Sequence, residues 1–267
     1  MSSDSTFAGS IPELYDTVLV PMVFLDYAED VANLVAAGLP ADVLETAAGT
    51  GAVTRVVHRL LPEARLTATD LNAAMLTRAA EVLPASPLVT WQVANAQALP
   101  YDDATFDAVV CQFGAMFFPD RQMAYAEALR VLRPGGRFVL ATWGTSEDNE
   151  IVLFVEDALR QLFPDDPPLF FRRMPFGYTD VEQIRADLAA AGFGAIEIRA
   201  VEHRNAPTSA HDIAVAHCQG TPMSNALTER GADLGEVTDQ VTRLLERRIG
   251  TKPYAGRIMA NIATAAA

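Results

Sequence analysis

The feature that most constrains the fold is a regular alternation of strand-like and helix-like segments between residues 41 and 144. Short apolar segments predict strands, and the amphipathic segments of about ten to fifteen residues between them predict helices. The expected strands are 41–46, 64–70, 88–94, 106–114 and 137–144, and the expected helices are 51–62, 73–83 and 123–136. Strands separated by such helices form βαβ units, which predicts a parallel sheet with helices on both faces.

The segments outside this region are mostly helical in pattern. The expected elements are helices within 1–40, at 151–163 and at 181–193, a strand at 194–204, helices throughout 208–250 and a last short strand at 256–265. The Ala-rich end, ATAAA, is expected to fray. The fold class predicted is α/β, a doubly wound, seven-stranded, mostly parallel sheet with a helical N-terminal segment and a helical insertion near the C-terminus.

The composition disfavours several kinds of partner. The chain of 267 residues has a formal charge of −14, which would repel a phosphate backbone, so nucleic acid is not an expected substrate. The run VLVPMVFLDYA is interrupted by Pro21 and Asp26 and is shorter than the roughly 18 residues of a membrane span, and no secretory signal is visible. Cys111 and Cys218 are expected to be reduced thiols. These features predict a cytoplasmic protein with no membrane span.

The stretch VLETAAGTGAVT, residues 43–54, has the pattern of a nucleotide-binding turn. An apolar strand runs into small residues and then into a helix, which places backbone N–H groups and a helix N-terminus at the mouth of a site. Gly49 and Gly51 fit such a turn, because a side chain there would block the bend or the ligand. The alternative is a tight turn that binds nothing.

Asp70 supplies a second signal. It ends the expected strand 64–70, nineteen residues after Gly51, where an acid can accept hydrogen bonds from both hydroxyls of a ribose. The ordinary alternative is that Asp70 caps the helix that begins at Asn72 or Ala73.

The residues after the glycines help to select the nucleotide. A dinucleotide fingerprint requires a third glycine where this chain has Thr54, and a P-loop requires Lys-Ser/Thr where it has Ala52 and Val53. Neither NAD nor ATP is therefore favoured. A ligand that contains a ribose but no phosphates fits better.

Several segments of the sequence resemble the motifs of a known family. Residues 45–51, ETAAGTG, resemble motif I of the class I S-adenosylmethionine-dependent methyltransferases, and ATDLN, NAQALPYDDATFDAVVCQFG and LRPGGRFVLATW resemble their later motifs in the same order. The resemblance covers about residues 40–145. It is closest to the small-molecule branch that includes the ubiquinone and menaquinone biosynthesis methyltransferases, and it implies a Rossmann-like methyltransferase fold with S-adenosylmethionine as cofactor.

The resemblance also implies a division of the chain into parts. A single methyltransferase domain would span residues 1–267. Its parts would be an N-terminal helical cap at 1–40, a cofactor-binding core at 41–145 and a substrate-side half at 146–267, with a helical insertion at about 205–250.

The family pattern implies a set of cofactor-binding residues. Glu45, with Thr46 beside it and the turn at Ala47, Gly49 and Gly51, would hold the methionine moiety; Asp70 would bind the ribose, and Leu71 and Met75 would border the adenine; Asn95, Ala96 and Gln97 would contact the adenine amino group; Gln112 and Phe113 would line the floor near the sulfonium; Tyr15 would belong to a segment that folds over the cofactor. Two positions depart from the pattern. Relatives commonly have Cys or Gly where this chain has Ala47 or Ala48, and Asp where it has Asn95, and both changes are read as tolerated.

The sequence assigns no catalytic residue. The candidates are His203, His211 and His217, each of which could equally be a solvated or core histidine, while His58 is expected to pack or to face water. Trp143 suits either a pocket wall or the core. No metal is expected, because Asp102 and Asp103 lie in a turn and no Cys or His cluster has zinc spacing.

The leading hypothesis is methyl transfer to a small-molecule acceptor at O, N or C, which leaves S-adenosylhomocysteine. The alternative is a methyltransferase-fold biosynthetic enzyme that binds the cofactor for a non-methylating reaction such as cyclisation, and the third is a binding or scaffold protein with a degenerate site. The aromatic run at 167–178, PPLFFRRMPFGY, is a candidate lid or interface, the latter of which would make a homodimer.

Overall fold

The computed structural model describes residues 3–267, which form two compact units that interleave along the chain. The helical unit comprises residues 3–24, 144–177 and 202–259, and the sheet unit comprises residues 25–143, 178–201 and 260–267. Each unit therefore combines segments that are far apart in the sequence. The assignment of separate roles to 1–40, 41–145 and 146–267 stays a prediction.

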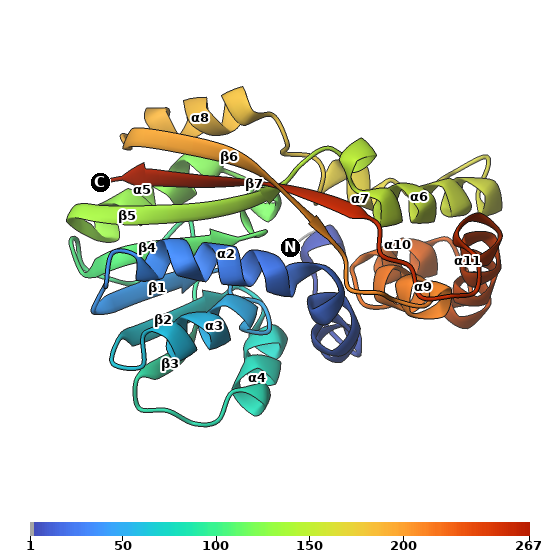
Figure 1. Ribbon diagram of the computed structural model, residues 1–267, viewed down its shortest axis with the longest axis horizontal. Helices are drawn as coiled ribbons and strands as arrows, with labels where there is room; N and C mark the ends of the chain where they lie inside the picture. The colour runs from blue at the N-terminus through green and yellow to red at the C-terminus, as the bar shows by residue number, and fades with distance from the viewer. Residues whose placement is uncertain (1–2) are drawn as a thin grey trace. The chain divides into compact units, whose positions relative to one another are not determined.

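The sheet has seven strands and confirms the predicted fold class. The strands are β1 (Asp42–Thr46), β2 (Arg65–Asp70), β3 (Val89–Val93), β4 (Phe106–Gln112), β5 (Leu132–Trp143), β6 (Gly194–Arg204) and β7 (Arg257–Ala266). Their order is β3-β2-β1-β4-β5-β7-β6, and Figure 1 shows β7 between β5 and β6. The pairs from β3 to β5 are parallel, and β7 is antiparallel to β5.

Helices accompany the strands of the sheet unit on both faces of the sheet (Figure 1). They are α2 (Leu25–Ala36), α3 (Ala52–Leu60), α4 (Ala73–Val82), η3 (Ala115–Phe117), α5 (Arg121–Val131) and α8 (Val181–Ala190). Helix α2 packs against α3, and α5 packs against α8. In α2 the side chains of Tyr27 and Val31, four residues apart, are completely buried, because this spacing places both on one face of the helix.

The central strands are apolar on both faces. Leu44 of β1, Val109 of β4 and Val139 of β5 are completely buried, as expected for strands that helices cover on both sides. This core fixes the strand ends from which the candidate site residues project.

Two boundaries differ from the predictions. Residues 132–136 were expected to end a helix, but α5 stops at Val131 and they belong to β5, with Gly135 in the left-handed region at φ 80°. The Ala-rich end does not fray, because β7 is a ten-residue strand in which Ala265 pairs with Phe138 and Ala260 with Trp143. Pairing with β5 therefore holds these residues in a strand despite the weak strand propensity of alanine.

The helical unit contains the remaining helices. They are η1 (Ser3–Ser5), α1 (Ile11–Leu14), η2 (Tyr15–Phe24), η4 (Ser146–Asp148), α6 (Glu150–Leu162), α7 (Phe170–Arg173), α9 (Ala210–Cys218), α10 (Met223–Glu229) and α11 (Leu234–Ile249). Helix α11 packs against α6 and α9. The aromatic rings of Phe170 and Phe171 are 1% and 3% exposed, so these two rings belong to the core of this unit and do not form the exposed lid or interface considered above.

Segment η2 is a π-helix, which the sequence did not predict. Its Tyr15 and Phe24 rings stack with centroids 5.2 Å apart. In an α-helix, with 3.6 residues per turn, two residues nine positions apart lie on opposite faces. The wider π-helix has about 4.4 residues per turn, so the same two residues lie on one face. The π winding therefore makes this ring contact geometrically available.

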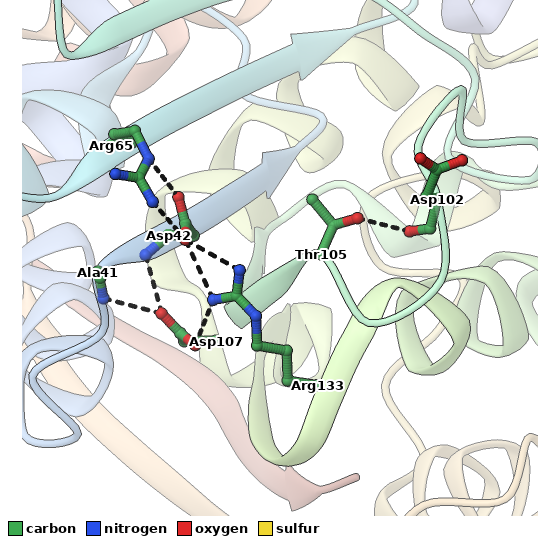
Figure 2. Close-up of polar contacts among 7 residues, drawn as sticks. All are labelled: Ala41, Asp42, Arg65, Asp102, Thr105, Asp107 and Arg133. Carbon is green, nitrogen blue, oxygen red and sulfur yellow. Dashed lines mark hydrogen bonds and ion pairs between the residues drawn. The ribbon is translucent and has the colours of Figure 1, made fainter.

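An ion-pair cluster joins the beginnings of the central strands. Figure 2 shows Asp42 of β1 between Arg65 and Arg133, with Arg133 also bound to Asp107 of β4. The Asp107 carboxylate also accepts hydrogen bonds from the backbone N–H groups of Ala41 and Asp42, at 2.9 and 3.0 Å. The cluster lies at the amino ends of the strands, the edge opposite to the candidate site residues.

We expect Asp107→Asn to destabilise the fold by about 1 kcal/mol at neutral pH. Burial raises the pKa of Asp107, but its hydrogen bonds from Arg133, Asp42 and Ala41 outweigh burial and place the pKa below its usual value. A lowered carboxyl pKa contributes stability above the unfolded-state pKa of about 4, and this contribution is lost as the pH falls through the folded-state value. Urea unfolding at about pH 7 and pH 3 should show the difference shrinking at the lower pH.

The control for this prediction is Asp102→Asn. Asp102 is exposed on the neighbouring turn, where its backbone carbonyl accepts a hydrogen bond from Thr105 (Figure 2), so the stability should change little at either pH. An equal loss for Asp107→Asn at both pH values would contradict the ionic origin of its contribution.

Candidate cofactor site

The predicted site residues of the sheet unit lie at the carboxyl ends of neighbouring strands. Thr46 ends β1, Asp70 ends β2 and Gln112 ends β4. The chain runs outward from β1 to β3 on one side and from β4 onward on the other, so the strand order reverses between β1 and β4. Doubly wound sheets bind their ligands at this switch point.

The turn after β1 has three left-handed residues. Ala47, Gly49 and Gly51 have φ values of 52°, 56° and 79°. The Ala48 N–H donates to the Thr69 carbonyl at 2.8 Å, which ties the turn to β2. Left-handed backbone costs roughly 1–2 kcal/mol in a non-glycine residue, so Ala47 is a strained position that the surrounding structure holds.

Ala47 lies against the chain that follows β4. A Cβ atom added to Gly114 would collide with the Cβ atom of Ala47. The small residue at 47 and the glycine at 114 therefore form a matched pair. The departure from the family pattern at position 47 or 48 is accommodated in the folded chain without a gap at this contact.

Gly51 is restricted by packing as well as by its backbone. A Cβ atom there would lie 2.6 Å from Cη2 of Trp91 and 3.3 Å from the Cβ atom of Ala79. The sequence had explained this glycine by the bend or the ligand alone. The fold adds a reason, because β3 and α4 occupy the space that a side chain would need.

Asp70 holds the glycine turn and also the entry to α4. Its side chain is accessible only in part, with the residue 8% exposed. One carboxylate oxygen accepts from Gly49 N–H at 2.9 Å and the other from Asn72 N–H at 2.8 Å. Burial raises the pKa of Asp70 against these hydrogen bonds. Asp70 does not cap α4, whose N-cap residue is Asn72, but it holds the chain just before this helix. A carboxylate with about four acceptor positions retains capacity for further donors.

Glu45 points beneath the turn. The residue is 6% exposed, and its Oε2 accepts a short hydrogen bond from the hydroxyl of Thr54 on α3. Burial raises the pKa of Glu45 to about 8, despite the hydrogen bond from Thr54. The sequence pattern marks Thr54 only as a departure from the dinucleotide fingerprint and does not predict its contact with Glu45.

The residues predicted to border an adenine differ in exposure. Leu71 is 44% exposed, whereas Met75 is buried in α4. The side-chain oxygen of Asn95, expected to meet an amino group, accepts from Gln97 N–H at 3.0 Å in a local turn. Ala96 between them is half-buried.

An aromatic cluster lies at the ends of β4 and β5. Phe113, in the left-handed region at φ 54°, stacks on Trp143 with ring centroids 3.9 Å apart and an interplanar angle of 12°. Tyr27 of α2 meets both rings edge-on, at 5.5 and 5.7 Å. Gln112, immediately before Phe113, is half-buried. The cluster of Tyr27, Phe113 and Trp143 is largely buried, so Trp143 packs against a predicted site residue.

The remaining candidates lie in the helical unit. Tyr15 stacks on Phe24 there, and its predicted role over the cofactor stays a prediction. His211 is exposed and His203 is half-buried, and a catalytic role for either stays a prediction.

His217 is a buried residue of α9, which agrees with the core alternative considered for it. Its Nδ1 lies 2.8 Å from the Ile213 carbonyl of the preceding helical turn, and its ring meets Phe171 edge-on. Burial lowers the pKa of His217 to about 4, which keeps the ring neutral at physiological pH.

Three further expectations concern cysteines, metals and membranes. Cys111 and Cys218 are buried free thiols. Asp103 pairs with Arg130 at 2.8 Å, and across residues 3–267 no group of three or more His, Cys, Asp or Glu side chains is arranged to hold a metal ion. Within the same residues, no helix combines the length and apolar character needed to cross a membrane.

Comparison with known proteins identifies the fold and the domain. Residues 44–140 match the family described as methyltransferase domain. The chain is 38% identical over 109 residues to the ubiquinone/menaquinone biosynthesis C-methyltransferase of Bartonella henselae, covering 39% of this chain and 42% of that protein. It is 34% identical over 124 residues to the malonyl-[acyl-carrier protein] O-methyltransferase of Hahella chejuensis, covering 44% and 42%. The aligned part thus spans less than half the length of these relatives.

A solved structure extends the likeness in fold. Phosphoethanolamine N-methyltransferase 2 of Haemonchus contortus, in complex with phosphomonomethylethanolamine and S-adenosylhomocysteine, superposes with a TM-score of 0.61 at 15% identity, covering 96% of this chain and 56% of that one. At this identity the likeness concerns the fold. Residues 44–140 thus match a methyltransferase domain, and the solved structure shows that the chain shares the fold of such an enzyme.

Proposed function

We propose that the protein transfers a methyl group from S-adenosylmethionine to a small-molecule acceptor and leaves S-adenosylhomocysteine. The observation that carries the proposal is the pairing of Asp70 with the glycine turn at the switch point of the sheet. A buried acid directly beside a turn of left-handed residues suits a ligand that presents ribose hydroxyls. The methyltransferase names of the relatives in the same region support this choice.

The chain's own residues suggest how the cofactor would be held. Asp70 would accept hydrogen bonds from the ribose hydroxyls, using the capacity that its contacts with Gly49 and Asn72 leave. The exposed Leu71 side chain offers an apolar surface to the adenine. Glu45 would act from beneath the turn through its charge, near the methionine end, since it is 6% exposed and bonded to Thr54.

Methyl transfer depends mainly on the position of the acceptor relative to the methyl group. S-adenosylmethionine supplies a methyl group already activated on a cationic sulfur. The protein must hold an acceptor in line with that group, and placement of this kind can contribute roughly 7–11 kcal/mol. Phe113 would present an aromatic edge or face to the cationic centre, and its stack on Trp143 fixes its orientation. A separate general base is needed only where the acceptor must lose a proton.

The acceptor class and setting also belong to this proposal. The formal charge of −14 supports a small molecule and disfavours nucleic acid as the acceptor. The free buried thiols Cys111 and Cys218 suit a reducing compartment such as the cytoplasm.

The proposal is tested by binding and by label transfer. We expect saturable binding of S-adenosylhomocysteine in a calorimeter, with one site per chain. With methyl-labelled S-adenosylmethionine and panels of quinol, carboxylate and amine acceptors, we expect label in a product. Binding without transfer to any acceptor, together with turnover of an unlabelled product, would favour the non-methylating alternative, and an absence of binding would refute the cofactor assignment.

A further inference from the structure

We propose that Thr54 is a positioning residue of the cofactor site, whose hydroxyl holds the Glu45 carboxyl group beneath the glycine turn in the ionised form that a cationic methyl donor favours. This inference rests on the proposed function, because it takes the turn at residues 47–51 to be the cofactor turn. It concerns a residue that the methyltransferase motif does not include and that the sequence pattern had treated only as a departure.

The geometry places the Thr54 hydroxyl in contact with the carboxyl group of Glu45. Thr54 is the third residue of α3 and is 2% exposed. Its hydroxyl donates to Oε2 of Glu45, at the end of β1. The first turn of a helix also carries partial positive charge from its backbone N–H groups. The hydroxyl and the helix end therefore both favour a negative charge on Glu45.

The space around this pair is otherwise apolar. Glu45 and Thr54 border a void of about 10 Å³, whose other lining residues are Val43, Val57, Leu66, Thr67, Ala68 and Val110. Such a void has room for about one water molecule. A carboxylate buried in these surroundings requires a hydrogen-bond donor to stay charged.

The groups around Glu45 have opposing effects on the pKa of its carboxyl group. Burial raises the pKa of Glu45 to about 8, the Thr54 hydrogen bond lowers it, Arg55 on α3 lowers it further and Asp70 on β2 raises it. From β4, the thiol of Cys111 also interacts with Glu45. At neutral pH the carboxyl group is thus mostly protonated in the free protein, about one pH unit below its midpoint. A sulfonium and an ammonium group nearby would favour the ionised form, and loss of the Thr54 hydroxyl would favour the protonated one.

The experiment compares Thr54→Val with Thr54→Ser. Valine keeps the shape and removes the hydroxyl, whereas serine keeps the hydroxyl. Titration calorimetry with S-adenosylmethionine from about pH 6 to pH 9 measures the affinity of each variant. In the parent, affinity should rise with pH as Glu45 ionises, through a midpoint near 8. In Thr54→Val the midpoint should move upward and the affinity at neutral pH should fall about tenfold, as for the loss of one hydrogen bond to a charged group. Thr54→Ser should restore both.

Matched variants separate the effect from general damage. Thr238→Val replaces a buried threonine of α11 in the helical unit, where the hydroxyl donates to the Leu234 carbonyl, and it should keep the parent's pH profile. Glu45→Gln keeps an acceptor for Thr54 but cannot ionise, so it should remove the pH dependence even if Thr54→Val fails to fold. The amino group of the ligand titrates identically with every variant and cancels in the comparison.

The outcomes distinguish this inference from the proposed function. If the parent binds S-adenosylmethionine but Thr54→Val or Glu45→Gln keeps the parent's pH profile, then Thr54 only packs and the inference is wrong while the function stands. If the parent binds neither S-adenosylmethionine nor S-adenosylhomocysteine at any pH, both are wrong.

Discussion

Asp70→Ala is expected to weaken binding of S-adenosylhomocysteine at least 100-fold. The variant would lose hydrogen bonds from two ribose hydroxyls to a carboxylate, each worth about 1.5–3 kcal/mol. It would also release the N–H groups of Gly49 and Asn72, which Asp70 now satisfies at 2.9 and 2.8 Å, and this should lower the stability of the fold by about 1–3 kcal/mol. Titration calorimetry and urea unfolding of the same preparation measure the two losses.

Two further variants separate the loss of binding from the loss of stability. Asp70→Asn keeps one side-chain acceptor but presents an NH₂ group to the other donor, so it should recover part of the stability and little of the binding. Asp102→Asn changes an exposed acid of the turn before β4 and should leave both unchanged. A folded Asp70→Ala protein that bound as tightly as the parent would remove the ribose assignment, and the contacts with the turn and with α4 would then be the whole role of Asp70.

The alternation of strands and helices and the glycine turn could be predicted because they depend on local chemistry. The alternation of apolar strands and amphipathic helices predicts a parallel sheet. Asp70 follows Gly51 by only nineteen residues and ends the next strand, so it lies at the same edge of the sheet as the glycine turn. Left-handed backbone at Gly49 and Gly51 follows from residue type. No long-range information is needed for these features.

The features that were missed depend on packing between distant segments. The Ala-rich end forms a strand because it lies beside Phe138 and Trp143 of β5, which no local propensity encodes. The burial of His217, which lowers the pKa of its ring to about 4, depends on how α9 packs and not on the local sequence. The contact of Thr54 with Glu45 joins residues nine apart, across a turn whose path the sequence outlines without its side-chain directions.

The π winding of η2 was missed for a different reason. Five apolar residues of this segment are buried, Leu19, Val20, Met22, Val23 and Phe24, and their burial alone does not distinguish π from α winding. Pro21 lies inside the helix, and a proline cannot donate the backbone hydrogen bond that a regular α-helix would require of it. The ring stack of Tyr15 on Phe24 then follows from the winding.

Gly51→Ala is expected to destabilise the sheet unit by about 2–5 kcal/mol and to weaken cofactor binding more than tenfold. Two costs combine. An alanine at φ 79° costs about 1–2 kcal/mol from its backbone, and its Cβ atom, 2.6 Å from Cη2 of Trp91, adds about 1–3 kcal/mol of overpacking. Relief of that overlap would have to move the turn, which changes the position of the Gly49 and Gly51 N–H groups. Urea unfolding and calorimetry with S-adenosylhomocysteine measure the two effects.

Gly135→Ala separates these costs, because Gly135 lies in the same unit at φ 80° with no atom within 4 Å of an added Cβ. This control should lose only the backbone part and keep its binding. Shortening the opposing ring in Gly51→Ala/Trp91→Phe should recover stability relative to the sum of the single changes, since residues in contact are not additive. If Gly51→Ala and Gly135→Ala lost equal stability, the Trp91 ring would move away from the added Cβ atom at no energetic cost. In that case the left-handed backbone alone requires the glycine, and the contact of the turn with β3 would not contribute to holding the cofactor site in place.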